Sequence, residues 1–200
     1  ESMPAVFRML TSRNSTRLLG YLNYDSGWGS GACRRFLRDN HIDLGECLDD
    51  PAGFVSARQA FERKIRYWEC RPMPEDTHAV ASPCDARVLV GSFREQASLF
   101  VKDKFFNYEE LLGGGRHNWL AAFENGDYAI FRLTPEKYHY NHMPVAGRVL
   151  DCYTVEGDYH SCNPGAAVLV ATPYSKNRRV VTVIDTDVEG GTQVGKVAMI

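Results

Sequence analysis

Two histidines three positions apart form the first candidate site. They are His139 and His142 in the segment YHYNHMP, which ends at Pro144. On a helix, residues at this spacing share a face and could hold one metal ion. Proline, however, disfavours helix in the residue before it, and in an extended strand positions i and i+3 point to opposite faces. A zinc-dependent hydrolase therefore needs a bend between the two imidazoles. From this segment alone, two hydrogen-bonded polar residues at a strand end are the simpler interpretation.

Asp85 is the second candidate. It lies in SPCDARVL, residues 82–89, where a turn leads into an apolar run. A turn aspartate commonly bonds its own backbone. It gains a chemical role only beside a histidine, because a carboxylate that orients an imidazole makes that ring a competent base for a hydroxyl nucleophile. Both roles stay open at this stage.

The composition restricts the class of protein. The 200 residues are 44% apolar and 24% charged, as in ordinary soluble globular proteins, and the net charge of −2 does not favour nucleic-acid binding. The six cysteines form no C-x-x-C pair, which favours free thiols in a reducing, cytoplasmic setting. Residues 5–38 hold six arginines and one acid, Asp25. This segment could meet an anionic membrane surface or form a solvated helix face.

The chain changes character near residue 72. Residues 1–72 are expected to be a helical region, and one helix face is predicted by apolar residues three or four apart: Phe54, Ala57, Phe61, Ile65 and Trp68. Residues 73–200 contain short β-branched and aromatic runs separated by turn signals. An α+β fold is therefore expected, with the second part a mainly antiparallel β barrel or sandwich.

A short internal repeat lies in the β-rich part. PCDARVL, residues 83–89, and PVAGRVL, residues 144–150, share proline, arginine, valine and leucine at matching positions. Each predicts a proline, a tight turn and then a strand. The repeat suggests an internal duplication.

Together these motifs resemble the phosphatidylserine decarboxylase family. SPCDARVL is similar to the family's S-P-x-D-G-x-[VI] segment, and VKDKFFNYEELLGG to its lysine-containing strand and LLG loop. LTPEKYHYNHMPVAG is similar to L-[ST]-P-x-[DN]-Y-H-R-x-H-x-P-x-x-G, and KNRRVVTVIDT to its N-E-R-V-V strand. The resemblance runs from about residue 30 to the end, and the order and spacing of the motifs make it specific.

The resemblance implies a carboxy-lyase made as a proenzyme. In this family an Asp–His–Ser triad cuts the chain before a serine of an L-G-S-[TS] motif. That serine becomes a covalent pyruvoyl cofactor on the α subunit, which binds the substrate amine as a Schiff base and acts as an electron sink. Asp85 matches the triad acid and His142 the triad base. His139 matches the histidine of the decarboxylation step, and no metal is implied.

The departures from the family pattern bear on the substrate and the chain's extent. Ala86 replaces a usual glycine, Tyr140 replaces a usual arginine, and no L-G-S-T motif is present. The chain is therefore expected to be most of a β subunit, incomplete at its C-terminus, with the pyruvoyl-forming serine elsewhere.

The leading expectation is conversion of phosphatidylserine to phosphatidylethanolamine. The enzyme would be cytoplasmic and peripheral on the membrane through residues 5–38, and a homodimer is a further expected assembly. The alternatives are a related decarboxylase acting on a free amino acid and a non-catalytic β-barrel binding module.

Overall fold

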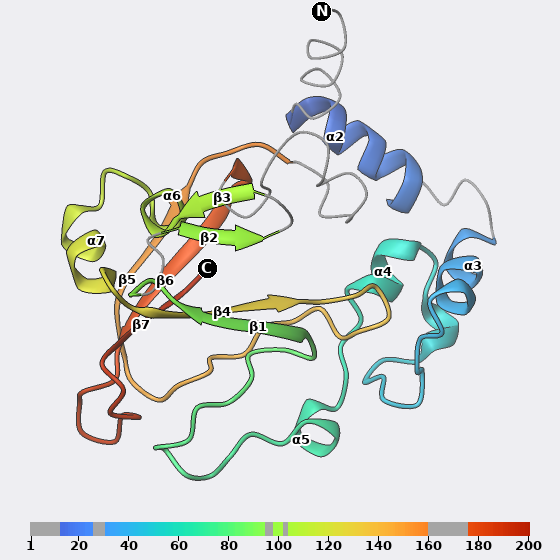
Figure 1. Ribbon diagram of the computed structural model, residues 1–200. Coiled ribbons are helices and arrows are strands. Elements are labelled where there is room, and N and C mark those ends of the chain that lie inside the picture. The colour runs from blue at the N-terminus through green and yellow to red at the C-terminus, as the bar shows by residue number, and fades with distance from the viewer. Residues whose placement is uncertain (1–12, 26–30, 95–97, 102–103, 160–175) are drawn as a thin grey trace, which may run out of the picture. The chain divides into compact units, whose positions relative to one another are not determined.

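The computed structural model describes residues 13–25, 31–94, 98–101, 104–159 and 176–200. Helices precede residue 72, whereas strands predominate after it, as Figure 1 shows. The predicted α+β class is confirmed. None of the helices in these ranges is long and apolar enough to cross a membrane.

The helices are short, and side-chain caps start two of those before residue 72. Asp50 accepts a hydrogen bond from the amide of Ala52, and Ser56 accepts one from the amide of Gln59, so each satisfies a free amide in a first turn. In chain order the helices are α2 (Arg13–Gly20), the π-helix η1 (Tyr21–Asp25), α3 (Ala32–Asp39), the 3₁₀ helix η2 (Pro51–Gly53), α4 (Ala57–Phe61), α5 (Tyr67–Cys70), α6 (Tyr108–Leu112) and α7 (His117–Phe123).

The single helix predicted between Phe54 and Trp68 is wrong. The chain leaves α4 at Glu62 and starts α5 only at Tyr67. Between them the backbone pairs with residues 46–48: the Leu48 amide donates to the Lys64 carbonyl at 2.9 Å, and the Arg66 amide to the Glu46 carbonyl at 3.0 Å. These tertiary hydrogen bonds replace helical ones, and Ile65 still becomes buried.

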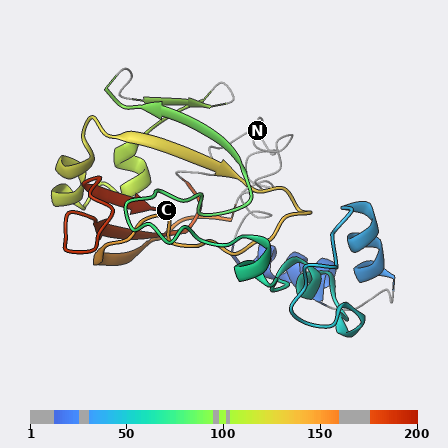
Figure 2. The same cartoon turned by 90° about the horizontal axis from the view of Figure 1, so that it is seen from below.

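Among the described residues, seven strands form three sheets. In chain order they are β1 (Arg87–Ser92), β2 (Ser98–Val101), β3 (Lys104–Asn107), β4 (Asp127–Arg132), β5 (Arg148–Val155), β6 (Arg179–Asp185) and β7 (Lys196–Met199). β1 pairs with β4, which Figure 2 shows as neighbouring green and yellow ribbons. β2 pairs with β3, and β5, β6 and β7 form an antiparallel sheet. The run at 166–171, AAVLVA, which also has strand character, lies outside the described residues.

The three-stranded sheet carries a hydrophobic core. Val181 and Val183 of β6 are fully buried on one face, where Tyr153 of β5 and Leu112 of α6 join them. Side chains from both helices and both outer strands pack around this cluster: Tyr108, Trp119, Leu120, Phe123, Val155 and Ala198. Burial of this kind contributes about 1.5–3 kcal/mol per large apolar side chain.

The repeat seen in the sequence begins two strands at matching positions. β1 starts at Arg87 and β5 at Arg148, the arginine of each copy. A side chain at Gly147 would place its Cβ 2.5 Å from the carbonyl oxygen of Asp185, so β5 can approach β6 only because this residue is glycine. The duplication itself stays a prediction.

The described chain gathers into two compact units. One contains residues 89–130 and 145–200, and the other contains residues 17–88 and 131–144. The expected division into domains at residue 72 stays a prediction. Asp85, His139 and His142 all belong to the second unit.

We expect Arg179→Ala to weaken folding of the full-length protein. The guanidinium donates to the carbonyl oxygens of Leu111, Asn177 and Glu110, and two of these lie in the last turn of α6. Its loss should lower the free energy of unfolding by roughly 1–3 kcal/mol in a urea titration. The neighbouring Arg178 pairs with an exposed Glu156, so Arg178→Ala should cost less than about 0.5 kcal/mol. Equal losses would contradict this account.

Candidate active site

Two segments far apart in the sequence run side by side at the site. The Ala81 amide donates to the Pro144 carbonyl, and the His142 amide donates to the Pro83 carbonyl, both at 2.8 Å. As the residue number rises from 81 to 83 in one segment, that of its partner falls from 144 to 142, so the segments are antiparallel. This pairing joins the predicted SPCD turn to the predicted His pair. It sets the backbone of His142 beside the turn that carries Asp85.

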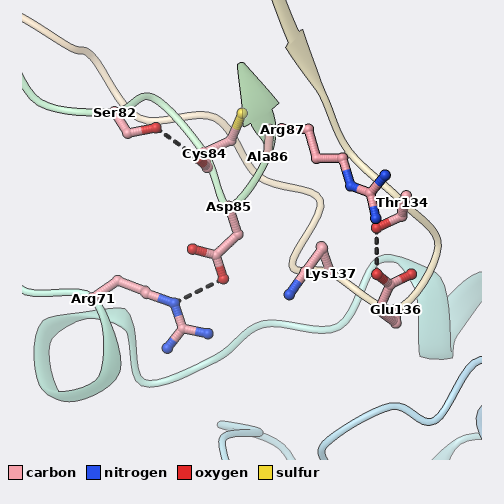
Figure 3. Close-up of a pocket in the computed structure, with 9 residues that line it drawn as sticks. All are labelled: Arg71, Ser82, Cys84, Asp85, Ala86, Arg87, Thr134, Glu136 and Lys137. Atoms are coloured by element: carbon pink, nitrogen blue, oxygen red, sulfur yellow. Dashed lines mark hydrogen bonds and ion pairs between the residues drawn. The ribbon is translucent and has the colours of Figure 1, made fainter.

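The Asp85 carboxylate binds an arginine. Arg71 Nε donates to Asp85 Oδ2 at 2.7 Å, as Figure 3 shows, and the other guanidinium nitrogens of Arg71 bind both oxygens of Glu46 at 2.9 and 3.1 Å. The hydrogen bonds to Glu46, which have the larger effect, and to Asp85 raise the pKa of Arg71 above its already high ordinary value. No hydrogen bond joins Asp85 to His142 in the described residues, so the triad pairing stays a prediction.

His142 has an unpartnered ring nitrogen. Its Nε2 is buried and makes no hydrogen bond. The ring lies between two aromatic side chains, with centroids 4.8 Å from Tyr67 and 5.7 Å from Tyr138. A buried nitrogen without a partner is costly unless a further group meets it, so this atom is a candidate for contact with something outside the described residues.

His139 has a different environment. Its ring stacks on Phe61 of α4 with centroids 3.8 Å apart, and Nε2 donates to the Thr134 carbonyl at 3.1 Å. Burial lowers the pKa of His139, while the bond to Thr134 opposes this shift in part. The ring is therefore neutral at neutral pH. The two histidines thus differ in both their aromatic contacts and their hydrogen bonds.

Three further residues near the site have defined environments. Arg63 is 4% exposed and donates to the carbonyls of Ala60 and Glu136, which ties the end of α4 to the histidine segment. The Tyr140 hydroxyl donates to the Glu62 carbonyl at 3.2 Å. Ala86 does not have a positive φ, so alanine in place of the usual glycine brings no strain there.

An open depression borders Asp85. Figure 3 shows Asp85, Arg71 and Lys137 around it, with Arg87 and Glu136 on the opposite side. The thiol of Cys84 also lines it, and burial followed by the charge of Asp85 raises the pKa of that thiol. The thiol therefore stays protonated near neutral pH and is a poor nucleophile. Within the described ranges, no three His, Cys, Asp or Glu side chains gather to hold a metal.

Reasoning from the sequence missed the charged partners of the site. Arg71 and Glu46 were not among the predicted residues, because no local pattern links two positions 25 residues apart. Phe61 was predicted only as part of an apolar helix face and Arg63 was not among the predicted residues, yet one stacks on His139 and the other holds its segment. The helical spacing that includes Phe61 was the signal that pointed toward this segment.

The chain matches the family model of phosphatidylserine decarboxylase over residues 57–200. This range contains Asp85, His139 and His142. The resemblance derived from the motifs is therefore confirmed at the level of the family.

Proteins named phosphatidylserine decarboxylase proenzyme are similar to most of the chain. One from Bordetella avium is 34% identical over 154 residues, which are 76% of this chain and 52% of that protein. One from Photobacterium profundum is 33% identical over 86% of this chain and 60% of its own length. One from Chromobacterium violaceum is 32% identical over 92% of this chain and 69% of its own length. The chain spans little more than half the length of the first two.

The half-buried His139 should make folding sensitive to acid. Because its pKa is lowered, the unfolded chain takes up the proton first, so the stability due to the neutral ring is present above about pH 6.5 and is lost as pH falls through the lower folded value. In the full-length protein, His139→Gln should lose less stability than the wild type between about pH 7 and pH 5 in urea titrations. His78→Gln, at an exposed position, is the control and should behave as the wild type. Identical losses for His139→Gln and wild type would refute the assignment.

Proposed function

The chain belongs to the phosphatidylserine decarboxylase family, and from this premise we propose that it is part of a pyruvoyl-dependent enzyme that decarboxylates phosphatidylserine after self-cleavage. The observation that carries the proposal is the pairing of the Asp85 turn with the His142 segment, together with the unpartnered Nε2 of His142. Curated relatives bear the name proenzyme, which supports a cut chain.

In the self-cleavage step, His142 acts as the base. Its unpartnered Nε2 takes the proton of the hydroxyl group of the serine at the cleavage site. The serine oxygen attacks the carbonyl before it, and the peptide bond becomes an ester as the proton passes to the released amine. Asp85 orients the His142 ring and stabilises its positive charge. The buried, unpartnered nitrogen fits this use, since a hydroxyl satisfies its missing hydrogen bond.

In the decarboxylation step, His139 holds and transfers a proton. The pyruvoyl group, when present, supplies the electron sink that carbon dioxide loss requires. His139 is neutral at neutral pH, and stacking on Phe61 with its bond to Thr134 holds the ring in one orientation. A neutral imidazole in a fixed position can take up a proton and return it to the product.

The intact masses of the full-length protein test the proposal. Wild type should yield two chains, the second blocked at its N-terminus by a pyruvoyl group. Asp85→Asn and His142→Ala should leave one uncut chain, because each removes a part of the base that activates the serine. His139→Ala should be cut normally yet fail to release carbon dioxide from phosphatidylserine.

The exposed His78 is the matched control, and His78→Ala should be cut and active. An uncut wild type would refute the proposal. So would a His142→Ala variant cut at the wild-type rate. Turnover of free amino acids and none of phosphatidylserine would favour the related decarboxylase, for which the replacement of arginine by Tyr140 is the supporting observation.

We propose also that the enzyme is cytoplasmic and lies peripherally on an anionic membrane through residues 5–38. Within the described part of this segment, Leu18, Leu19 and Leu22 are exposed, at 59%, 44% and 45%. Arg17 of α2 is exposed beside them. Exposed leucines next to arginines are typical of a helix that lies in the lipid interface.

Flotation with vesicles tests membrane contact. The full-length protein should float with vesicles that contain phosphatidylserine and less with neutral phosphatidylcholine vesicles. Leu18→Asp combined with Leu22→Asp should reduce flotation, since charge opposes insertion of these side chains. Val55→Asp, at an exposed apolar position outside the segment, should float as wild type. Failure of the wild type to float would end this proposal.

A further inference from the structure

We propose that Arg71 is the positioning residue for Asp85 during self-cleavage, an inference that rests on the proposed function. One guanidinium joins two carboxylates that lie far apart in the sequence. Its Nε binds Asp85 Oδ2 at 2.7 Å, and its two terminal nitrogens bind Glu46. Arg71 thereby links the triad acid to a loop of the helical region.

Contacts other than the bond to Asp85 hold Arg71 in place. The two bonds to Glu46 form a forked ion pair, and a terminal nitrogen also donates to the Cys70 carbonyl at 2.9 Å. The loop of Glu46 is fixed in turn, because the Arg66 amide donates to the Glu46 carbonyl. A forked pair restricts the guanidinium to one plane, which leaves Nε directed at Asp85.

Asp85 needs such an anchor because its side chain borders an open depression. The backbone around it is tightly turned, with the Ala86 amide donating to the Cys84 carbonyl at 3.0 Å. No other hydrogen bond fixes the carboxylate in the described residues. Without Arg71 the side chain is free to rotate into solvent, and rotation of the acid removes the orientation that it gives to an imidazole.

The contact leaves Asp85 able to serve a second partner. Arg71 binds only Oδ2, and Figure 3 shows the other oxygen directed away from the guanidinium. A carboxylate accepts several hydrogen bonds at once, so one oxygen can stay on Arg71 while the other accepts from the His142 ring. Lysine cannot replace Arg71, because a single ammonium lacks the fork that spans both carboxylates.

The opposite role makes an opposite prediction. If Arg71 withheld Asp85 from His142, its removal would speed self-cleavage. If Arg71 positions Asp85, its removal slows self-cleavage. The sign of the change therefore decides between the two.

The experiment follows self-cleavage of the full-length protein made by cell-free translation, so that uncut chain is present at the start. Arg71→Ala should slow the first-order cleavage by about 10- to 100-fold, the effect of a misplaced catalytic group. Arg71→Lys should recover little. Added guanidinium ion at millimolar, non-denaturing concentration should restore part of the Arg71→Ala rate by occupying the vacated position. Glu46→Gln should slow cleavage less than Arg71→Ala does.

Arg66→Ala is the matched control. Arg66 binds the same loop through the carbonyls of Gly45 and Cys47 but has no bond to Asp85, and its backbone amide, which holds the Glu46 carbonyl, is kept in Arg66→Ala. Cleavage by Arg66→Ala should stay near the wild-type rate. An equal slowing in Arg66→Ala, no rescue by guanidinium, or unchanged or faster cleavage in Arg71→Ala would overturn the inference. Wild-type cleavage by Asp85→Asn would instead refute the proposed triad, whatever Arg71→Ala shows.

Discussion

The site depends on the backbone pairing between residues 81–83 and 142–144. Two hydrogen bonds, from Ala81 to Pro144 and from His142 to Pro83, hold together segments that are distant in the sequence. Because backbone groups make these bonds, the pairing does not depend on which side chains the site carries. It also explains the prolines at both places: Pro83 and Pro144 each contribute a carbonyl and have no amide to satisfy. The side chains of Asp85 and the histidines can then be tuned by their own neighbours.

Around this pairing, the two histidines are prepared in opposite ways. His139 stacks on Phe61 and donates from Nε2 to the Thr134 carbonyl, and burial lowers its pKa. His142 keeps a buried nitrogen with no partner. A ring held by stacking and a hydrogen bond suits a step in which a proton is held and returned. A ring with an unpartnered nitrogen suits one that must bind a hydroxyl group. Arg71 also contacts two groups at once: its Nε binds the Asp85 carboxylate, and its two terminal nitrogens bind Glu46.

Reasoning from the sequence succeeded where the signal is local. The short β-branched and aromatic runs that became β1, β4, β5, β6 and β7 carry their signal within a few residues, as does the turn before each strand of the repeat. It failed between Phe54 and Trp68. The helical spacing is present there, but the backbone forms hydrogen bonds with residues 46–48 instead of continuing the helix. Periodicity reports which residues become buried, and Ile65 was buried, but it does not report which hydrogen-bond partner the backbone chooses.

The sequence by itself determined the family, the α+β class and the three residues on which the chemistry is proposed to rest. These follow from the order and spacing of short motifs, which can be recognised without knowing the fold. Only the tertiary structure decided what those residues touch. It placed Asp85 on Arg71, stacked His139 on Phe61 and left His142 without a partner at Nε2. Each contact joins positions well separated in the chain, and such contacts leave no local pattern. Their geometry arises only when the separate segments pack together.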